Sequence, residues 1–188
     1  MTTETRPMSV LEAIYERRAI RAYTSQQVDK PTIMKLLDAA VQAPTAIHLE
    51  PWAFVVIQSR PLLDRICERS KELADKPAGA IHRVLANPSF HICHDAGTMI
   101  VICAKPLGAF VTADCWLAAE NLMLAATSLG LATCPIGFAL PALAELAFKD
   151  EVGIPRDVTA VVPIVVGYAA TKPPASTRRA PEILAWKE

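Results

Sequence analysis

An uncharged stretch from Leu122 to Ala144 limits what this chain can fold into more than any other feature. The stretch is as long as a membrane-spanning helix. A continuous spanning helix is not expected, because four helix-breaking residues interrupt the stretch: Gly130, Pro135, Gly137 and Pro141. Residues 113–129 form a helical pattern that is apolar on nearly every side, which predicts a helix at the centre of a domain or at a subunit interface. We therefore expect no membrane partner.

The composition is that of a globular protein. Of the 188 residues, 52% are hydrophobic and 20% are charged, which is too apolar for a disordered chain. It also favours apolar surface that closes against another chain. We expect one domain over residues 1–188. Lys and Arg total 19 and Asp and Glu total 19, so the formal net charge is zero and no nucleic-acid partner is expected.

The spacing of the seven glycines excludes two phosphate-binding loops. No two glycines lie two positions apart, so the dinucleotide fingerprint G-x-G-x-x-G does not occur. No two lie five positions apart either, so the loop G-x-x-x-x-G-K does not occur. A phosphorylated cofactor would have to be held by arginine side chains instead.

Hydrophobic periodicity predicts an α+β protein, because helices lead and strands are interspersed without regular alternation. Ser9 and Glu12 form a capping box that opens the first helix. The predicted helices span residues 10–17, 31–43, 60–74, 113–129 and 140–148. The predicted strands span residues 53–57, 98–103 and 159–166. Pro163 suggests an edge or a bulge in the last strand, and the proline-rich tail from Tyr168 is expected to be an extended arm.

The cysteines are odd in number and lie mostly in apolar runs, at Cys67, Cys93, Cys103, Cys115 and Cys134. Residues 1–7 are polar and have no character of a secretory leader. We therefore expect reduced thiols and a cytoplasmic protein.

A metal site is the rival interpretation for one histidine-rich segment. The residues concerned are His91, Cys93, His94 and Asp95, with His82 nearby. Their spacing matches no strong zinc template, so no metal is expected. A Cys–His nucleophile is no better supported, because no activating context is visible.

Two arginine groups are candidates for phosphate binding. Arg17, Arg18 and Arg21 place three guanidiniums within five residues, beside a helix end. Such a cluster can grip a phosphate, although it is also typical of a solvated surface patch. Arg178 and Arg179 are either a second phosphate clamp or a solubilising pair.

Two loops are candidates for binding a planar ligand. Residues 43–52 carry a hydroxyl, a histidine and a carboxylate between a helix and a strand, which suits a binding loop or a connector that packs Trp52 into the core. Residues 130–137 follow the most apolar helix and offer backbone N–H groups to a heterocycle edge. The alternative for this segment is an ordinary helix stop and turn.

Together these segments resemble the FMN-dependent nitroreductase family over nearly the whole chain, from Leu11 to Trp186. The family's motifs are R-R-x-I-R, A-P-S-x-x-N-x-Q-P-W, G-L-G-T-C-W/P-I-G, strand-G-Y-P and the tail arginines. They correspond in order to residues 17–21, 43–52, 130–137, 167–169 and 178–179. Each motif alone is weak, but this order and these separations are specific.

The resemblance implies a mixed, mainly antiparallel sheet flanked by helices, in an intertwined homodimer whose extended arm over residues 168–188 packs on the partner. FMN would bind at the subunit interface, with NADH or NADPH as electron donor and a nitroaromatic, quinone or related electrophile as acceptor. The flavin would carry the chemistry, with no catalytic side chain. One chain would hold the phosphate, ribityl chain and pyrimidine edge with Arg17, Arg18, Ala19 and Arg21. Further contacts would come from Pro135, Ile136 and Gly137, from the partner's copies of Pro44, Thr45, Ala46 and His48, and from Arg178 or Arg179.

Three departures from the family pattern change polar groups at the expected site. His48 replaces an asparagine, Glu50 replaces a glutamine, and Ala19 replaces a serine. An ionised Glu50 facing the ring would lower the flavin potential, whereas a Glu50 paired with His48 or Arg21 would be silent. Two alternatives to a broad reductase therefore stay open. One is a flavin-binding store or sensor without turnover, and the other is a specialised member that acts on one biosynthetic or halogenated substrate or cleaves flavin itself.

Overall fold

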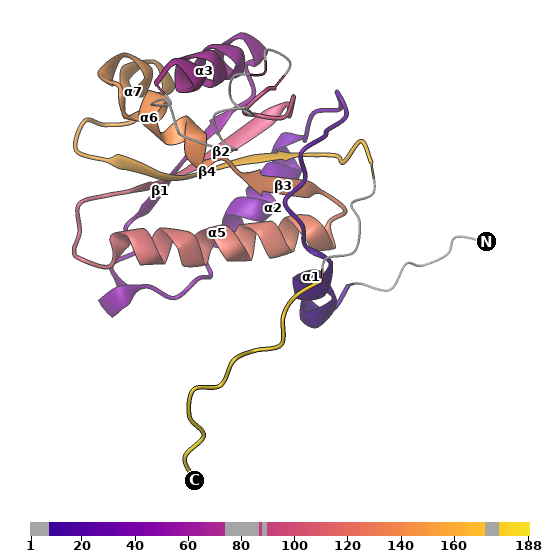
Figure 1. Cartoon of the computed structure of the whole chain (residues 1–188). Helices are drawn as coiled ribbons and strands as arrows, with labels where there is room; N and C mark the ends of the chain where they lie inside the picture. The colour runs from indigo at the N-terminus through magenta and orange to yellow at the C-terminus, as the bar shows by residue number, and fades with distance from the viewer. Residues whose placement is uncertain (1–7, 74–86, 88–89, 172–176) are drawn as a thin grey trace.

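A four-stranded sheet forms the centre of the protein (Figure 1). The computed structural model describes residues 8–73, 87, 90–171 and 177–188. The strands are β1 (Trp52–Ile57), β2 (Thr98–Ala104), β3 (Ala132–Pro135) and β4 (Thr159–Gly167). Their order is β1-β2-β4-β3, and each neighbouring pair is antiparallel. The predicted α+β class with a mainly antiparallel sheet is confirmed.

Helices cover both faces of this sheet, as Figure 1 shows. One face carries α2 (Lys30–Ala40) and α5 (Val111–Ser128), and the other carries α3 (Arg60–Leu73), α6 (Leu140–Ala144) and α7 (Leu146–Val152). Successive side chains of a strand point to opposite faces. Ile100 therefore joins the core beneath α2 and α5, whereas Met99 joins the core beneath α3 and α6. Because both faces are covered, β2 is buried along its whole length, which explains its continuous apolar sequence.

Helix α5 buries one side and leaves the other side open. Its inward residues include Cys115, Ala119 and Leu122, all with no measurable exposure. On its outer side Trp116 is 46% exposed and Leu117 is 47% exposed. The outer apolar side chains explain why the sequence pattern looks apolar all round. Within the described ranges, no helix is long and apolar enough to cross a membrane.

The first helix, α1 (Val10–Glu16), begins at the predicted capping box. The Ser9 hydroxyl accepts from the Glu12 N–H at 3.3 Å, and the Glu12 carboxylate accepts from the Ser9 N–H at 2.7 Å. This reciprocal pair satisfies two donors that the first turn of a helix leaves free.

The chain that follows α1 is fastened along the edge of the sheet. The Ile20 N–H donates to the Thr133 carbonyl at 3.0 Å, and the Thr24 N–H donates to the Tyr168 carbonyl at 2.9 Å. Between these bonds the Tyr23 ring packs on Gly167, where an added Cβ would lie 3.0 Å from the ring. The arginine-rich segment is therefore held against β3 and the end of β4.

Three local predictions need correction. Strand β3 was expected as a bent loop, but its backbone pairs with β4 from Ala132 to Pro135. Of the two positions suggested for Pro163, the edge is wrong, because β4 lies inside the sheet, whereas a register shift does occur nearby, between Ile102 and Cys103 of β2. The helix expected over residues 140–148 is two helices, because the backbone at Glu145 is extended.

The prediction of five reduced thiols is wrong for two of them. Cys67 of α3 and Cys93, in the turn before β2, form a disulfide, and their Cα atoms lie 6.3 Å apart. The fold brings together two residues that are 26 positions apart in the sequence, which spacing alone does not reveal. Cys103, Cys115 and Cys134 are free and buried.

The C-terminal residues 177–188 are exposed and contain neither helix nor strand. Figure 1 shows them leading away from the sheet and its helices. The predicted extended arm is confirmed for these residues. Its packing on a partner stays a prediction.

Candidate functional site

A cavity of about 540 Å³ opens where β3 ends. It lies between the end of the arginine-rich segment, the start of the 3-10 helix η2 (Gly137–Ala139) and the turn before β2. Its lining is mostly apolar, with one arginine and one histidine. The lining residues are Arg21, Phe90, Ile92, His94, Cys134, Pro135, Ile136, Gly137 and Phe138.

Four of the residues predicted from sequence meet at this cavity. They are Arg21 from the first motif and Pro135, Ile136 and Gly137 from the third. Pairing of the Arg17–Arg21 segment with β3 brings them together, because Ala19 forms a parallel bridge with Thr133. The Ile136 N–H is already bonded to the Pro163 carbonyl at 2.8 Å, and a proline has no N–H. Of the three β3-end residues, Gly137 is left to offer a backbone donor.

The other arginines of the first motif, Arg17 and Arg18, do not line this cavity. Arg17 pairs with Glu120 of α5, with Nε and Oε1 3.3 Å apart. Arg18 Nη1 donates to the carbonyls of Tyr15 and Arg17 at 2.7 Å each. Arg18 Nε is buried and has no hydrogen-bond partner in the described part of the chain. A buried donor of this kind is costly unless a ligand or water accepts from it.

The far wall of the cavity was missed from sequence. It comes from residues 90–95, where Phe90, Ile92 and His94 line the space. The Phe90 and His94 rings meet edge to face, with centroids 5.7 Å apart. His94 and Asp95 have positive φ angles of 52° and 61°, which is uncommon for residues other than glycine. The only sequence signal here was the histidine-rich pattern that raised the metal interpretation.

His94 is held in a form that resists protonation. Burial lowers its pKa below the usual range, and the nearby positive charge of Arg21 lowers the pKa further, while Asp95 opposes both. Its imidazole is therefore neutral at pH 7 and can donate or accept one hydrogen bond within the cavity.

The loop with Pro44, Thr45, Ala46 and His48 does not line the cavity. The Ala46 N–H donates to Oδ1 of the buried Asp114 at 3.2 Å, which ties the loop to the first turn of α5. Helix α5 has 18 residues and therefore rises about 27 Å, and β3 follows its other end. The second motif and the cavity thus lie at opposite ends of this helix.

Backbone strain marks this same loop. Ile47, His48 and Glu50 all have positive φ angles, of 46°, 57° and 46°. Strain at neighbouring residues persists only where the surroundings fix it, and such residues cluster at functional sites. In the single chain His48 and Glu50 are exposed, and the Glu50 N–H donates to the Thr45 hydroxyl at 3.4 Å.

The tail arginines Arg178 and Arg179 are exposed and away from the cavity. The metal interpretation gains no support. Within the described ranges, no three His, Cys, Asp or Glu side chains gather as a metal site. Cys93 is bonded to Cys67 in a disulfide, and His82 lies outside the described residues.

Comparison with known proteins places these features in one family. The sequence profile of the Nitroreductase family matches residues 14–168. A protein of Methanothermobacter thermautotrophicus named as an NADH dehydrogenase/NAD(P)H nitroreductase is 34% identical over 171 residues, covering 88% of this chain and 80% of that protein. A protein of the same name from Archaeoglobus fulgidus is 31% identical and covers 84% of each chain. The crystal structure of a Bacteroides fragilis nitroreductase with bound FMN superposes with a TM-score of 0.83 at 28% identity, covering 95% of this chain and 98% of that one.

Replacing Arg21 with methionine tests the electrostatics of the cavity. Arg21→Met is expected to raise the pKa of His94 towards its usual value without reaching it, because burial remains. An NMR titration of the imidazole measures this shift, and Arg156→Met, at an exposed arginine that does not line the cavity, is the control. An unchanged pKa of His94 would show that Arg21 does not face it.

The same lowered pKa makes the folded protein sensitive to acid. The unfolded chain binds the His94 proton more tightly than the folded chain does, so stability falls as the pH drops below about 6.5. Asparagine also tolerates a positive φ angle, so His94→Asn removes the titrating group without adding backbone strain. The loss of stability on acidification is expected to be smaller in this variant, and urea unfolding at pH values above and below about 6.5 measures it.

Proposed function

Because the chain belongs to the nitroreductase family, we propose that it is an FMN-dependent NAD(P)H oxidoreductase that reduces small electrophilic acceptors such as nitroaromatics or quinones. One observation supports this most directly. Two motifs, at residues 17–21 and 130–137, lie more than 100 positions apart in the sequence. They pair through Ala19 and Thr133, and both contribute residues to the lining of the 540 Å³ cavity.

The cavity fits a flavin ring. Its volume lies within the usual range of small-molecule sites, and its walls are apolar apart from Arg21 and His94. A planar heterocycle of mixed polarity needs apolar faces and a few polar groups at its edge. Arg18 Nε, which is buried and has no partner among the described residues, is a further donor on the segment that leads to Arg21, suited to an anionic or carbonyl acceptor.

The proposed roles follow from these positions. Arg21 would lie at the pyrimidine edge, where a cation favours the negative charge of the reduced ring. Pro135 and Ile136 would pack on one side of the ring, and the Gly137 N–H would be the donor at its reactive edge. Bound FMN would supply the two-electron chemistry, taking a hydride from a nicotinamide and reducing the acceptor, so no side chain need act as a nucleophile.

The phosphate would be held by arginine side chains, and Ala19, on the same segment, would contribute to binding of the phosphate and the ribityl chain. Arg17 and Arg18 lie on the segment that leads into the cavity, and Arg178 or Arg179 would complete the clamp. The ion pair of Arg17 with Glu120 does not prevent this, because Glu120 is exposed and a pair open to solvent on one side contributes little.

We infer that the active unit is a homodimer, with residues 1–188 as one FMN-binding domain and residues 168–188 lying on the partner. In one chain Pro44, Thr45, Ala46 and His48 lie at the opposite end of α5 from the cavity, so a second copy has to supply them. Apolar side chains stand exposed on the outer side of α5 and on α1, including Trp116, Leu117, Leu11 and Tyr15. Exposed apolar groups that gather on neighbouring helices suit a subunit interface.

A flavin-binding protein without turnover is the second candidate function. The observation that favours it is the pair His48 and Glu50 on the strained loop, where a titratable ring and a carboxylate replace neutral amides. An ionised Glu50 beside the ring would disfavour electron uptake. For either function we propose the cytoplasm as the compartment, because NADH and NADPH are supplied there.

Anaerobic mixing with each nicotinamide separates the two functions. NADH or NADPH is expected to bleach the yellow absorbance of the FMN-loaded protein, and a nitroaromatic or quinone added afterwards is expected to restore it. Steady-state lines in double-reciprocal plots should be parallel, because donor and acceptor would use one cavity in turn. Absorbance that stays unchanged with both nicotinamides would favour the store or sensor.

Removing the clamp is expected to empty the site. Arg17→Ala combined with Arg179→Ala should weaken FMN binding by about a hundred-fold or more, since each bond to a charged group contributes about 1.5–3 kcal/mol. Glu120→Gln, which frees Arg17, should instead strengthen binding by up to about three-fold. Flavin fluorescence titration measures both, with the exposed Arg156→Ala as control. Full occupancy of the double variant would refute the clamp.

A charge on the outer side of α5 tests the dimer. Leu117→Glu is expected to give single subunits in sedimentation velocity and to lose FMN, because the partner loop is then missing. Leu146→Glu is the matched control, since Leu146 is similarly exposed at 53% but lies on α7, across the sheet. A dimeric Leu117→Glu protein with normal FMN affinity would contradict the proposed interface.

A further inference from the structure

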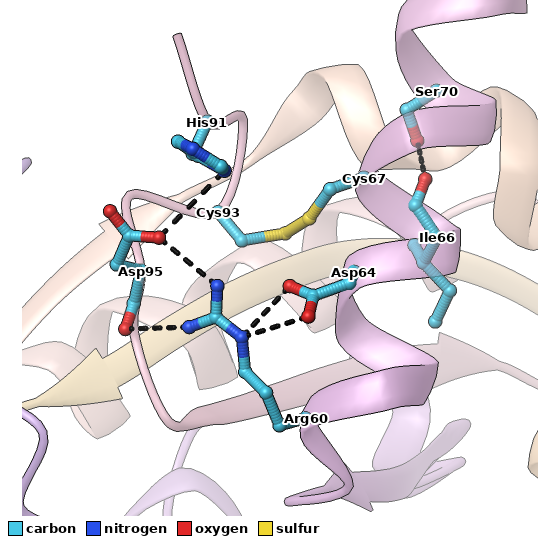
Figure 2. The surroundings of a disulfide bond; sticks show 8 residues. All are labelled: Arg60, Asp64, Ile66, Cys67, Ser70, His91, Cys93 and Asp95. Atoms are coloured by element: carbon cyan, nitrogen blue, oxygen red, sulfur yellow. Dashed lines mark hydrogen bonds and ion pairs between the residues drawn. A yellow bond between two sulfur atoms is a disulfide. The ribbon is translucent and has the colours of Figure 1, made fainter. Parts of the chain in front are cut away.

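The Cys67–Cys93 disulfide joins α3 to the turn that forms the far wall of the cavity. Figure 2 shows Cys67 on the helix and Cys93 on the turn before β2. The two residues are buried, at 7% and 5% exposure. The neighbours of Cys93 in sequence, Ile92 and His94, line the cavity. The disulfide therefore fixes the chain at Cys93, between two residues that line the cavity.

The turn is also held by noncovalent contacts: Ile92 is buried, and the His94 N–H donates to the His91 carbonyl at 2.9 Å. The side-chain ion pairs of the turn are exposed. Arg60 of α3 donates to the Asp95 carbonyl at 3.3 Å and to its carboxylate at 3.1 Å, and it also pairs with Asp64 (Figure 2). His91 Nδ1 lies 3.7 Å from the Asp95 carboxylate. Exposed ion pairs of this kind typically contribute little. The positive φ angles of His94 and Asp95 oppose this conformation, and the disulfide is the covalent bond among the contacts that maintain it.

A second cavity borders the disulfide at Cys67. It has a volume of about 400 Å³ and is lined by Arg60, Asp64, Cys67, Glu68, Lys71 and His91. Cys67 therefore faces a charged space large enough for a small thiol, while its partner Cys93 holds the wall of the first cavity. The three other thiols do not compete in exchange. Burial raises the pKa of Cys103 to about 11 and that of Cys115 to about 12, and it also raises that of Cys134.

We propose that Cys67–Cys93 is a thiol–disulfide exchange site, entered by a small thiol from the charged cavity at Cys67, and that cleavage of the bond releases the turn and weakens binding in the first cavity. The ligand that we propose for that cavity is FMN, so this inference rests on the proposed function.

The exchange needs a thiol reductant and takes place in two steps. A thiolate attacks the Cys67 sulfur, a mixed disulfide forms there, and Cys93 leaves as a thiolate that takes up a proton. A second thiol attacks the mixed disulfide and frees Cys67, which also takes up a proton. In total two electrons pass to the protein disulfide, and two molecules of thiol are oxidised to one disulfide.

FMN binding and reduction of the disulfide must then be thermodynamically linked. If cleavage weakens FMN binding by a given factor, bound FMN must make the disulfide harder to reduce by that same factor. A disulfide that only stabilises the fold, without touching the site, would show neither effect.

The main experiment compares the two redox forms of the unaltered protein. Thiol counts after unfolding should be three in the oxidised form and five after treatment with dithiothreitol, because three of the five cysteines are free in the structure. FMN is expected to bind the reduced form about five-fold more weakly, and to shift the dithiothreitol reduction midpoint correspondingly. Cys67→Ser/Cys93→Ser should match the reduced form and ignore dithiothreitol.

The possible outcomes are distinct. Equal FMN affinity in the two forms would overturn the exchange proposal alone, and so would five free thiols in protein treated with oxidised glutathione. Failure of FMN to bind either form would overturn the proposed function instead. Reoxidation of the unaltered protein should restore the original affinity, which keeps the test valid where the serine variant folds poorly.

The route of entry is tested by a charge change in the second cavity. Glu68→Gln should raise the rate of reduction by the anionic 2-mercaptoethanesulfonate relative to the cationic cysteamine by about three-fold at low salt, the size expected for one exposed charge. Glu72→Gln on the same helix does not border the cavity and should leave the ratio unchanged. An unchanged ratio in Glu68→Gln would place the attack elsewhere and overturn the assigned route.

Discussion

The hydrogen bond from the Ile20 N–H to the Thr133 carbonyl is the contact on which the candidate site depends. It carries the chain that leaves α1 across to β3, the edge strand of the sheet. An edge strand has unpaired backbone groups, so a passing segment can pair with it without disturbing the sheet. Arg21 reaches the cavity because of this pairing, and Tyr23 packed on Gly167 prevents the segment from moving away.

Much of the fold was predictable because its signals are local. The capping box at Ser9, the apolar run of β2 and the apolar pattern of α5 each depend on neighbouring residues, and the structure contains all three. Strand β3 was not predictable from such signals. Its four residues follow a glycine turn and end in Pro135, and they form a strand only because β4 lies beside them. For the same reason Pro163 was misplaced, since its neighbours in the sheet come from distant parts of the chain.

The candidate site also combines residues that local sequence motifs identify with residues that only the folded structure brings in. The arginine cluster and residues 135–137 were identified from motifs, and the structure brings Arg21 and Gly137 to one cavity. The opposite wall was not identified, because Phe90 and His94 form part of the site only through contacts made by the folded turn. The loop around Thr45 was identified from its motif, yet within one chain it lies far from the cavity. Its position becomes meaningful when a second subunit is considered.

The disulfide bears on the cytoplasmic location that we propose. Cytoplasmic thiol buffers keep most accessible disulfides reduced, so a purely structural Cys67–Cys93 bond would not be expected to persist there if small thiols reached it. The charged cavity at Cys67 gives small thiols such a path. A disulfide that persists would need stabilisation from its surroundings, and a ligand in the neighbouring cavity supplies that stabilisation by linkage. Occupancy of the site and the redox state of the turn would then depend on each other.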